Sequence, residues 1–213
     1  MASSIDTLWM RVAVAGKIHT TQAVRDLLHS FGLPKDGKKL FVILENFKIN
    51  ATRKLKRKIR EDQWDQICHD CNNQCPANCL KKGVSDLNDF DITILVILYR
   101  SIKHIIPTIT PQLLKLKAQL KPFVEQACYD RNSLMHFPKN MTQIEFDDAW
   151  NRTESCLNGM RYANMRDFNK MKTCLLDEYY KQQIDCLSDR CDHLKATKGD
   201  AVDVKINEKN IKG

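Results

Sequence analysis

Apolar residues recur every three or four positions through most of the chain, which is the spacing of an amphipathic helix. In the first thirty residues the shared apolar face consists of Ile5, Leu8, Trp9, Val12, Val24, Leu27 and Leu28. Ser4 is suited to cap the start of this segment, and Gly32 follows its last apolar residues. We predict a helix over residues 5–31, with Gly16 as a candidate break.

The same spacing continues over residues 38–60, where the apolar positions are Leu40, Phe41, Leu44 and Phe47. This second predicted helix ends in RKLKRKIR (53–60), the densest positive charge in the chain. Residues 68–88 show no such period, because the polar, cysteine-rich CHDCNNQCPANC is followed by turn-forming residues. We expect a loop here, between two halves of the domain.

The segment FDITILVILYRSIKHI (90–105) is apolar on all sides, which suits a buried strand as well as a buried helix. Its length favours a helix, since the apolar pattern runs on to Ile106 and strands are usually shorter. Asp89 is a candidate cap for its start, and Pro107 is expected to stop it.

Thr110 and Pro111 provide an N-cap followed by proline at the first helical position. The predicted helix that follows has an apolar face made of Leu113, Leu116, Leu120, Val124, Ala127 and Cys128. Pro122 lies inside it and is expected to kink or restart the helix, because proline lacks the backbone N–H.

Thr142 and Glu145 form a capping box ahead of another apolar face, which consists of Phe146, Ala149, Trp150, Thr153 and Leu157. A last amphipathic helix is predicted over about 161–194, on the pattern of Met165, Phe168, Met171, Leu175 and Tyr179. We therefore predict an all-α, up-and-down bundle of four to six helices. We divide it into a domain (1–160), a C-terminal helix (161–195) that packs on the domain or a partner, and a polar tail or linker (196–213).

The formal net charge is +8 and the isoelectric point is about 9.0, so an anionic partner is expected. The N-terminal segment lacks the pattern of a signal peptide, and the longest apolar run is far shorter than the ~18 residues of a membrane span. Nine cysteines are an odd number in a chain long enough to fold without disulfides. We expect reduced thiols, a cytoplasmic or nuclear location, and no membrane contact.

Four cysteines and a histidine lie within twelve residues: Cys68, His69, Cys71, Cys75 and Cys79. Thiolates can hold zinc in a tetrahedral site. The common zinc motifs, however, separate two cysteine pairs by a longer loop, which this spacing does not do. We therefore predict loop thiols without a metal, and no cofactor.

The order of four segments is the most specific feature: QWDQI (63–67), DFDITILVILYRSI (89–102), YDRNSLMH (129–136) and EFDDAW (145–150). Over roughly residues 20–160, this arrangement resembles the HEPN superfamily of all-α domains. It is most similar to the animal branch named after the DAZ-interacting zinc-finger ubiquitin ligase. The resemblance implies that Arg131, Asn132 and His136 are site residues of a ribonuclease that needs no metal. It also implies a homodimer, in which two copies of the motif form one composite site.

The residue types suit RNA cleavage through the 2′-OH. Neutral imidazole can accept the 2′-OH proton and imidazolium can donate one to the leaving oxygen, while a guanidinium can bind the phosphate. Asn132 is a candidate for orienting the phosphate or fixing the His136 tautomer. Positions five apart on a helix differ by about 140°. Arg131 and His136 can therefore act on one phosphate if the helix ends between them, as Pro138 suggests, or if they come from different subunits.

Several alternatives remain open from the sequence. Arg131 could pair with Asp130 or Glu125, and His136 could merely cap a helix end. The basic run could contact RNA, direct nuclear import or form a solvated face; its members are Arg53, Lys54, Lys56, Arg57, Lys58 and Arg60. The apolar residues after 160 could pack on the core or bind a protein partner. The domain as a whole could be a non-catalytic RNA-binding or interaction module in a stress or innate-immunity assembly.

Overall fold

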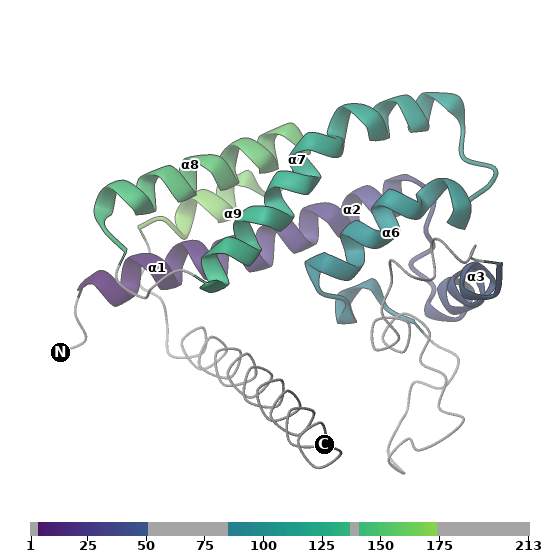
Figure 1. The fold of residues 1–213 in the computed structure, drawn as a ribbon, viewed down its shortest axis with the longest axis horizontal. Helices are drawn as coiled ribbons and strands as arrows, with labels where there is room; N and C mark the ends of the chain where they lie inside the picture. The colour runs from purple at the N-terminus through teal and green to yellow at the C-terminus, as the bar shows by residue number, and fades with distance from the viewer. Residues whose placement is uncertain (1–3, 51–84, 137–140, 174–213) are drawn as a thin grey trace, which may run out of the picture.

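The computed structural model describes residues 4–50, 85–136 and 141–173, which form helices and connecting turns without a β-strand (Figure 1). The helices in chain order are α1 (Ser4–Ala15), η1 (Gly16–Thr20), α2 (Thr21–Ser30), α3 (Gly37–Asn50), η2 (Leu87–Asp89), α6 (Ile92–Ile105), α7 (Pro111–His136), α8 (Gln143–Gly159) and α9 (Met165–Lys170). Counting the uninterrupted α1–η1–α2 segment once and leaving out the short 3₁₀ turn η2, these residues contain six helices. The predicted all-α fold is confirmed.

The predicted first helix is present, and Gly16 begins a π-helical turn instead of breaking it. The Thr20 hydroxyl donates a hydrogen bond to the Gly16 carbonyl within this turn. The segment ends as predicted at Gly32, whose φ of 106° lies in the left-handed region that favours glycine. Single π turns such as η1 occur often at functional sites.

The apolar segment whose sequence suited both a strand and a helix is the helix α6, and most of its residues are buried. Its cap is Asp91, whose Oδ1 accepts a hydrogen bond from the Ile94 backbone N–H at 2.9 Å. The expected cap, Asp89, instead lies in η2, because the chain makes a 3₁₀ turn before the helix begins. The helix ends at Ile105, two residues before Pro107.

The structure tests two further sequence predictions, one at Pro122 in α7 and one at the start of α8. The helix α7 continues through Pro122, so it does not restart there, and the alternative of a kink stays a prediction. The capping box of α8 is confirmed: the Thr142 hydroxyl accepts from the Glu145 N–H at 3.3 Å, and the Glu145 carboxylate accepts from the Thr142 N–H at 2.8 Å.

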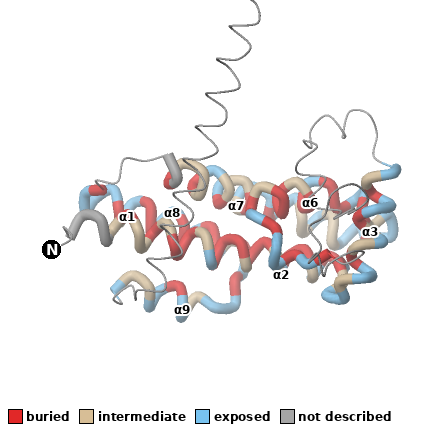
Figure 2. The backbone as a smooth tube through the Cα atoms, turned by 90° about the horizontal axis from the view of Figure 1, so that it is seen from below, coloured by how far each residue is buried: buried red, intermediate tan, exposed pale blue. Residues whose placement is uncertain are grey.

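The helices α6, α7 and α8 run in alternating directions beside the long α1–α2 segment, as expected for an up-and-down bundle (Figure 1). Buried residues run through the middle of the molecule, where these helices meet (Figure 2). All five residues of the predicted α8 face are buried. The described residues include no helix that is long and apolar enough to cross a membrane.

Residues 161–173 contribute to the same core. Arg161 adopts a left-handed conformation, and the helix expected from about 161 begins at Met165 and ends at Lys170. The Phe168 ring is fully buried and stacks on Trp150, with ring centroids 4.4 Å apart. Core packing is therefore the role of Phe168 in this chain, whereas Leu175 and Tyr179 lie outside the described residues. The division at residue 160 stays a prediction.

Candidate functional site

The Arg-Asn-x3-His motif occupies the last two turns of α7, and its backbone is helical through His136. The helix therefore does not end between Arg131 and His136, contrary to one of the two routes expected to bring them together. Their positions differ by about 140° around the helix axis. A break at Pro138 would come after both Arg131 and His136, and Pro138 lies outside the described residues. Side-chain contacts of His136 lie outside what the structure describes.

Asn132 forms a hydrogen bond with the neighbouring Arg131 side chain. The Arg131 Nη1 donates a hydrogen bond to the Asn132 Oδ1 at 3.0 Å. Position 132 lies one turn before position 136, so the two share a face. Asn132 thus holds the guanidinium against its own side chain. This is a third role for Asn132, beside the phosphate-orienting and tautomer-fixing roles, which stay predictions.

The two carboxylates that could have paired with Arg131 bind other groups in the described part of the chain. Asp130 is buried against α8, where its Oδ1 accepts from Gln126 at 2.9 Å and lies 3.5 Å from the Arg152 Nε. The Glu125 Oε1 lies 3.0 Å from the Arg100 Nη2. Among the described residues, the Arg131 guanidinium is therefore held by an amide and is not paired with a carboxylate.

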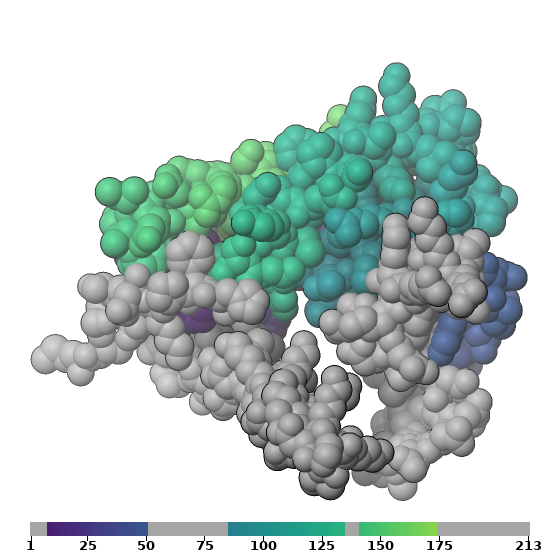
Figure 3. Space-filling model, in the orientation of Figure 1, coloured from purple at the N-terminus to yellow at the C-terminus, as the bar shows by residue number. Residues whose placement is uncertain are grey.

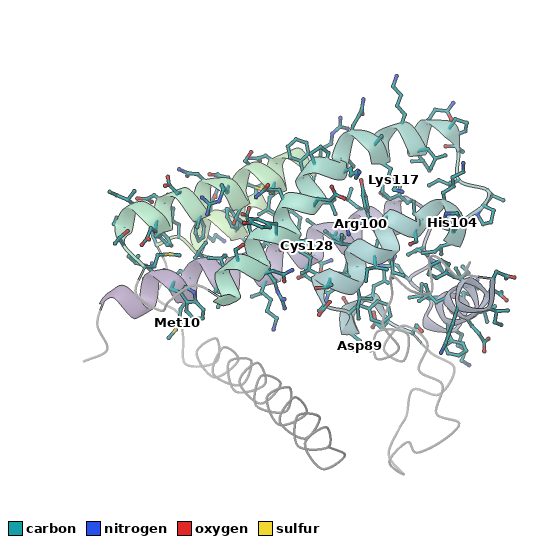
Figure 4. All side chains as sticks on the ribbon, in the orientation of Figure 1. Met10, Asp89, Arg100, His104, Lys117 and Cys128 are labelled. Carbon is teal, nitrogen blue, oxygen red and sulfur yellow. The ribbon has the colours of Figure 1, made fainter. Side chains whose placement is uncertain are left out.

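A second guanidinium lies near the motif, on α6. Both guanidiniums lie near the half-buried Cys128 thiol. Burial raises the pKa of this thiol, while Arg100 and Arg131 partly oppose that rise. Its Sγ is also 3.7 Å from the Asn132 Nδ2, a weak contact. Figure 4 shows Arg100 and Cys128 together where α6 approaches α7. The Cys128 thiol therefore stays protonated at neutral pH, and of the two nearby guanidiniums Arg100 is paired with Glu125.

Core contacts fix the end of α7. The Trp9 indole N–H donates a hydrogen bond to the Leu134 carbonyl at 2.9 Å, in a buried position. The Leu134 side chain is buried next to η1, at ordinary contact distance from a Cβ added to Gly16. The sequence indicated Trp9 only as part of an apolar face. Its polar contact with the motif could not be found from spacing, because the two residues are far apart in the chain.

Two sets of predicted residues lie outside the described residues. They are the basic run (53–60) and the cysteine cluster (68–79). Their RNA-binding and metal predictions therefore stay predictions. Among the residues that are described, no group of three or more His, Cys, Asp or Glu side chains is arranged to hold a metal ion.

Residues 37–184 match the family model described as DZIP3/hRUL138-like HEPN. The match covers more than half of the chain, and the described residues within it are helical. This protein therefore belongs to the DZIP3/hRUL138-like HEPN family, which confirms the resemblance drawn from its motifs. No curated protein and no solved structure matches the chain.

The matched region differs in extent from the roughly 20–160 expected from the motifs. It begins at α3, so the long α1–α2 segment precedes it, and it continues to residue 184. The Arg-Asn-x3-His motif lies inside it. The core contacts of Tyr162 and Phe168 agree with a family domain that extends past residue 160.

Proposed function

We propose that this HEPN domain is a metal-independent endoribonuclease that acts on single-stranded RNA. The observation that supports the proposal most directly is the hydrogen bond from Arg131 to Asn132. It orders a guanidinium that pairs with none of the described carboxylates, so its charge is available to a phosphate. The partner subunit of a dimer would bring a histidine, the residue type suited to proton transfer near neutral pH, to the same phosphate.

In the proposed reaction, His136 accepts the proton of the 2′-OH as that oxygen attacks the adjacent phosphorus. Arg131 binds the phosphate oxygens and stabilises the negative charge that develops on them. The 5′-oxygen leaves with a proton supplied by an imidazolium. The products are a 2′,3′-cyclic phosphate and a 5′-hydroxyl, and DNA is not cut because it lacks the nucleophile.

The uninterrupted α7 makes a homodimer part of this proposal. A single helix separates positions 131 and 136 by about 140°, so the second route, two copies of the motif around one phosphate, becomes the preferred one. A twofold axis brings the same surface of each copy together. The arginine of one subunit and the histidine of the other would then complete each site.

The basic run (53–60) is proposed to hold more of the RNA backbone, with the cytoplasm as the location of the reaction. The same 140° separation also supports a second candidate function. In a monomer this separation would keep the two groups apart, and the domain would be an RNA-binding or protein-interaction module without catalysis. The C-terminal region would then be a protein-binding element in a stress or innate-immunity assembly.

The test uses labelled single-stranded RNA in excess EDTA, with the wild type, Arg131→Gln and His136→Ala. The wild type should release fragments with cyclic-phosphate ends, and a positioned acid or base predicts a loss of about 10²–10⁴-fold in His136→Ala. RNA with 2′-O-methyl groups should stay intact. Equal degradation by all three proteins, or by none, supports the non-catalytic function instead.

Mixing the two inactive variants separates the dimeric mechanism from a monomeric one. A mixed dimer of Arg131→Gln with His136→Ala contains one site with both groups intact. Random re-pairing should therefore restore about a quarter of the wild-type activity. No recovery in a mixture that is shown to exchange subunits would contradict the composite site.

A further inference from the structure

The exposed ion pair between α6 and α7 is the starting observation. Arg100 places both its Nε and its Nη2 on one oxygen, Glu125 Oε1, at 3.1 and 3.0 Å. The two side chains are 56% and 35% exposed. Exposed pairs of this kind contribute little to stability, so another anion can displace the carboxylate.

Glu125 lies on the same side of α7 as Asn132 of the motif. Positions 125, 129 and 132 are spaced by four and three residues, so they form one stripe along the helix. The residue between the ion pair and Asn132 is Tyr129, which is 68% exposed. A tyrosine this exposed offers a free aromatic face. The stripe therefore carries, in order, a cation bound to Glu125, an aromatic ring and a cation bound to Asn132.

This order of groups matches the chemistry of a single nucleic-acid strand. Guanidinium groups bind phosphate oxygens with the same N–H fork that Arg100 uses on Glu125. Aromatic side chains stack on unpaired bases, whereas the bases of a duplex are not available for such stacking. The surfaces of α6 and α7 meet on the face that is turned to the viewer in Figure 3. Both guanidiniums act on the pKa of the Cys128 thiol, so they lie close enough together for one strand to contact both.

We propose that Arg100 is a second phosphate-binding residue and Tyr129 a base-stacking residue, so that the Arg100–Arg131 surface binds a single strand of RNA across at least two phosphates. This surface consists of Arg100, Glu125, Tyr129, Asn132 and Arg131. Glu125 occupies the phosphate position of Arg100 when RNA is absent. The proposal rests on the proposed function, which assigns phosphate binding to Arg131.

The first experiment measures binding of the full chain to a labelled 2′-O-methyl single-stranded RNA, which cannot be cleaved, over a range of salt concentrations. Arg100→Gln should weaken binding and reduce the slope of log K against log salt by about 0.7, the value for one phosphate contact on a single strand. Arg166→Gln, on the exposed surface of α9, is the matched control and should leave the slope unchanged.

Glu125→Gln is expected to change RNA binding in the direction opposite to Arg100→Gln. Both variants break the same ion pair, so a purely structural pair predicts the same direction of change in each. Competition with phosphate predicts tighter RNA binding for Glu125→Gln and weaker binding for Arg100→Gln. Thermal unfolding of both proteins checks that each remains folded.

Tyr129→Ala should weaken binding of the single strand by at least about fivefold, as expected for the loss of one stacked base, and Tyr129→Phe should retain it. Binding of duplex RNA should be unaffected by either change. Equal losses on both RNAs would overturn the stacking role.

The outcomes distinguish this inference from the proposed function. An unchanged slope in Arg100→Gln beside a reduced slope in Arg131→Gln contradicts the inference and leaves the proposed function standing. Unchanged binding in both variants contradicts the two together. If an acidic peptide displaces the RNA and binds more tightly to wild type than RNA does, the surface belongs to a protein partner and the inference is wrong.

Discussion

The indole N–H of Trp9 donates a hydrogen bond to the backbone carbonyl of Leu134, 2.9 Å away in the interior. Trp9 lies in α1, before the matched family region, and Leu134 lies within the Arg-Asn-x3-His motif. The carbonyl belongs to the last turn of α7, where backbone acceptors lack partners within the helix. The N-terminal helix therefore supplies a donor to one backbone carbonyl of the segment that carries the site.

Trp9→Phe is expected to lower the free energy of unfolding by about 1–3 kcal/mol, because the ring is largely kept while a buried carbonyl loses its donor. Amides of the last turn of α7 should exchange faster with solvent. Chemical denaturation and hydrogen exchange measure the two effects. Unchanged exchange in that turn would show that Trp9 does not order the motif.

Asn132→Ala is expected to lower RNA cleavage by about 10²-fold, because the Arg131 guanidinium loses the acceptor that holds it. The loss of stability should be small, since the hydrogen bond is only partly buried. Single-turnover cleavage and thermal unfolding measure these effects. Asn169→Ala, at an exposed position on α9, is the control and should leave cleavage unchanged. Full activity in Asn132→Ala would remove the positioning role.

We expect the folded protein to lose stability in mild acid because His19 is buried. Its Nδ1 lies 3.0 Å from the Tyr162 hydroxyl, and its Nε2 lies 3.2 Å from the Met171 sulfur. Burial lowers the pKa of His19 below its ordinary value near 6.5, and the nearby Asp167 only partly opposes this. The unfolded chain therefore binds a proton at a pH where the folded chain does not.

Stability should be complete above pH 6.5 and fall as the pH drops from 6.5 toward the lower folded-state pKa of His19. Urea denaturation at a series of pH values measures the slope. In His19→Gln the slope over this range should become smaller. His104→Gln removes an exposed imidazole from the last turn of α6 and should keep the wild-type slope. An equal slope in His19→Gln and wild type would contradict the prediction.

Gly159 is required by close packing between α7 and α8. A Cβ at this position would lie 2.3–2.5 Å from three ring carbons of Phe123. Gly159→Ala should therefore destabilise the protein by about 1–3 kcal/mol, despite the better helix propensity of alanine.

A second change tests the cause of that destabilisation. Phe123→Leu in the Gly159→Ala background should recover part of the loss, because it removes ring atoms that the new methyl group would meet. Gly16→Ala is the control, since its Cβ would be 3.8 Å from the nearest Leu134 atom, an ordinary contact. Thermal unfolding of the wild type, Gly159→Ala, Phe123→Leu and the double variant shows whether the two sites are coupled, with Gly16→Ala measured beside them.

Much of the fold follows from local pattern. The helix starts at Pro111 and Thr142 were predictable because caps and prolines act within a few residues. The choice of helix for α6 rested on its length, and it is confirmed. Predictions failed where two local signals competed, as with Asp89 and Asp91, since both aspartates suit an N-cap and only the preceding chain path selects one.

The sequence by itself determined the all-α fold, the family and the positions of the motif, because helical period, capping residues and motif order are properties of neighbouring residues. Only the tertiary structure decided that α7 runs unbroken past Arg131, that Asn132 holds its guanidinium, and that Arg100 approaches from α6. The Arg131–Asn132 contact depends on side-chain direction, and the approach of Arg100 depends on how α6 and α7 pack. Packing of that kind joins residues far apart in the chain, and no local spacing records it.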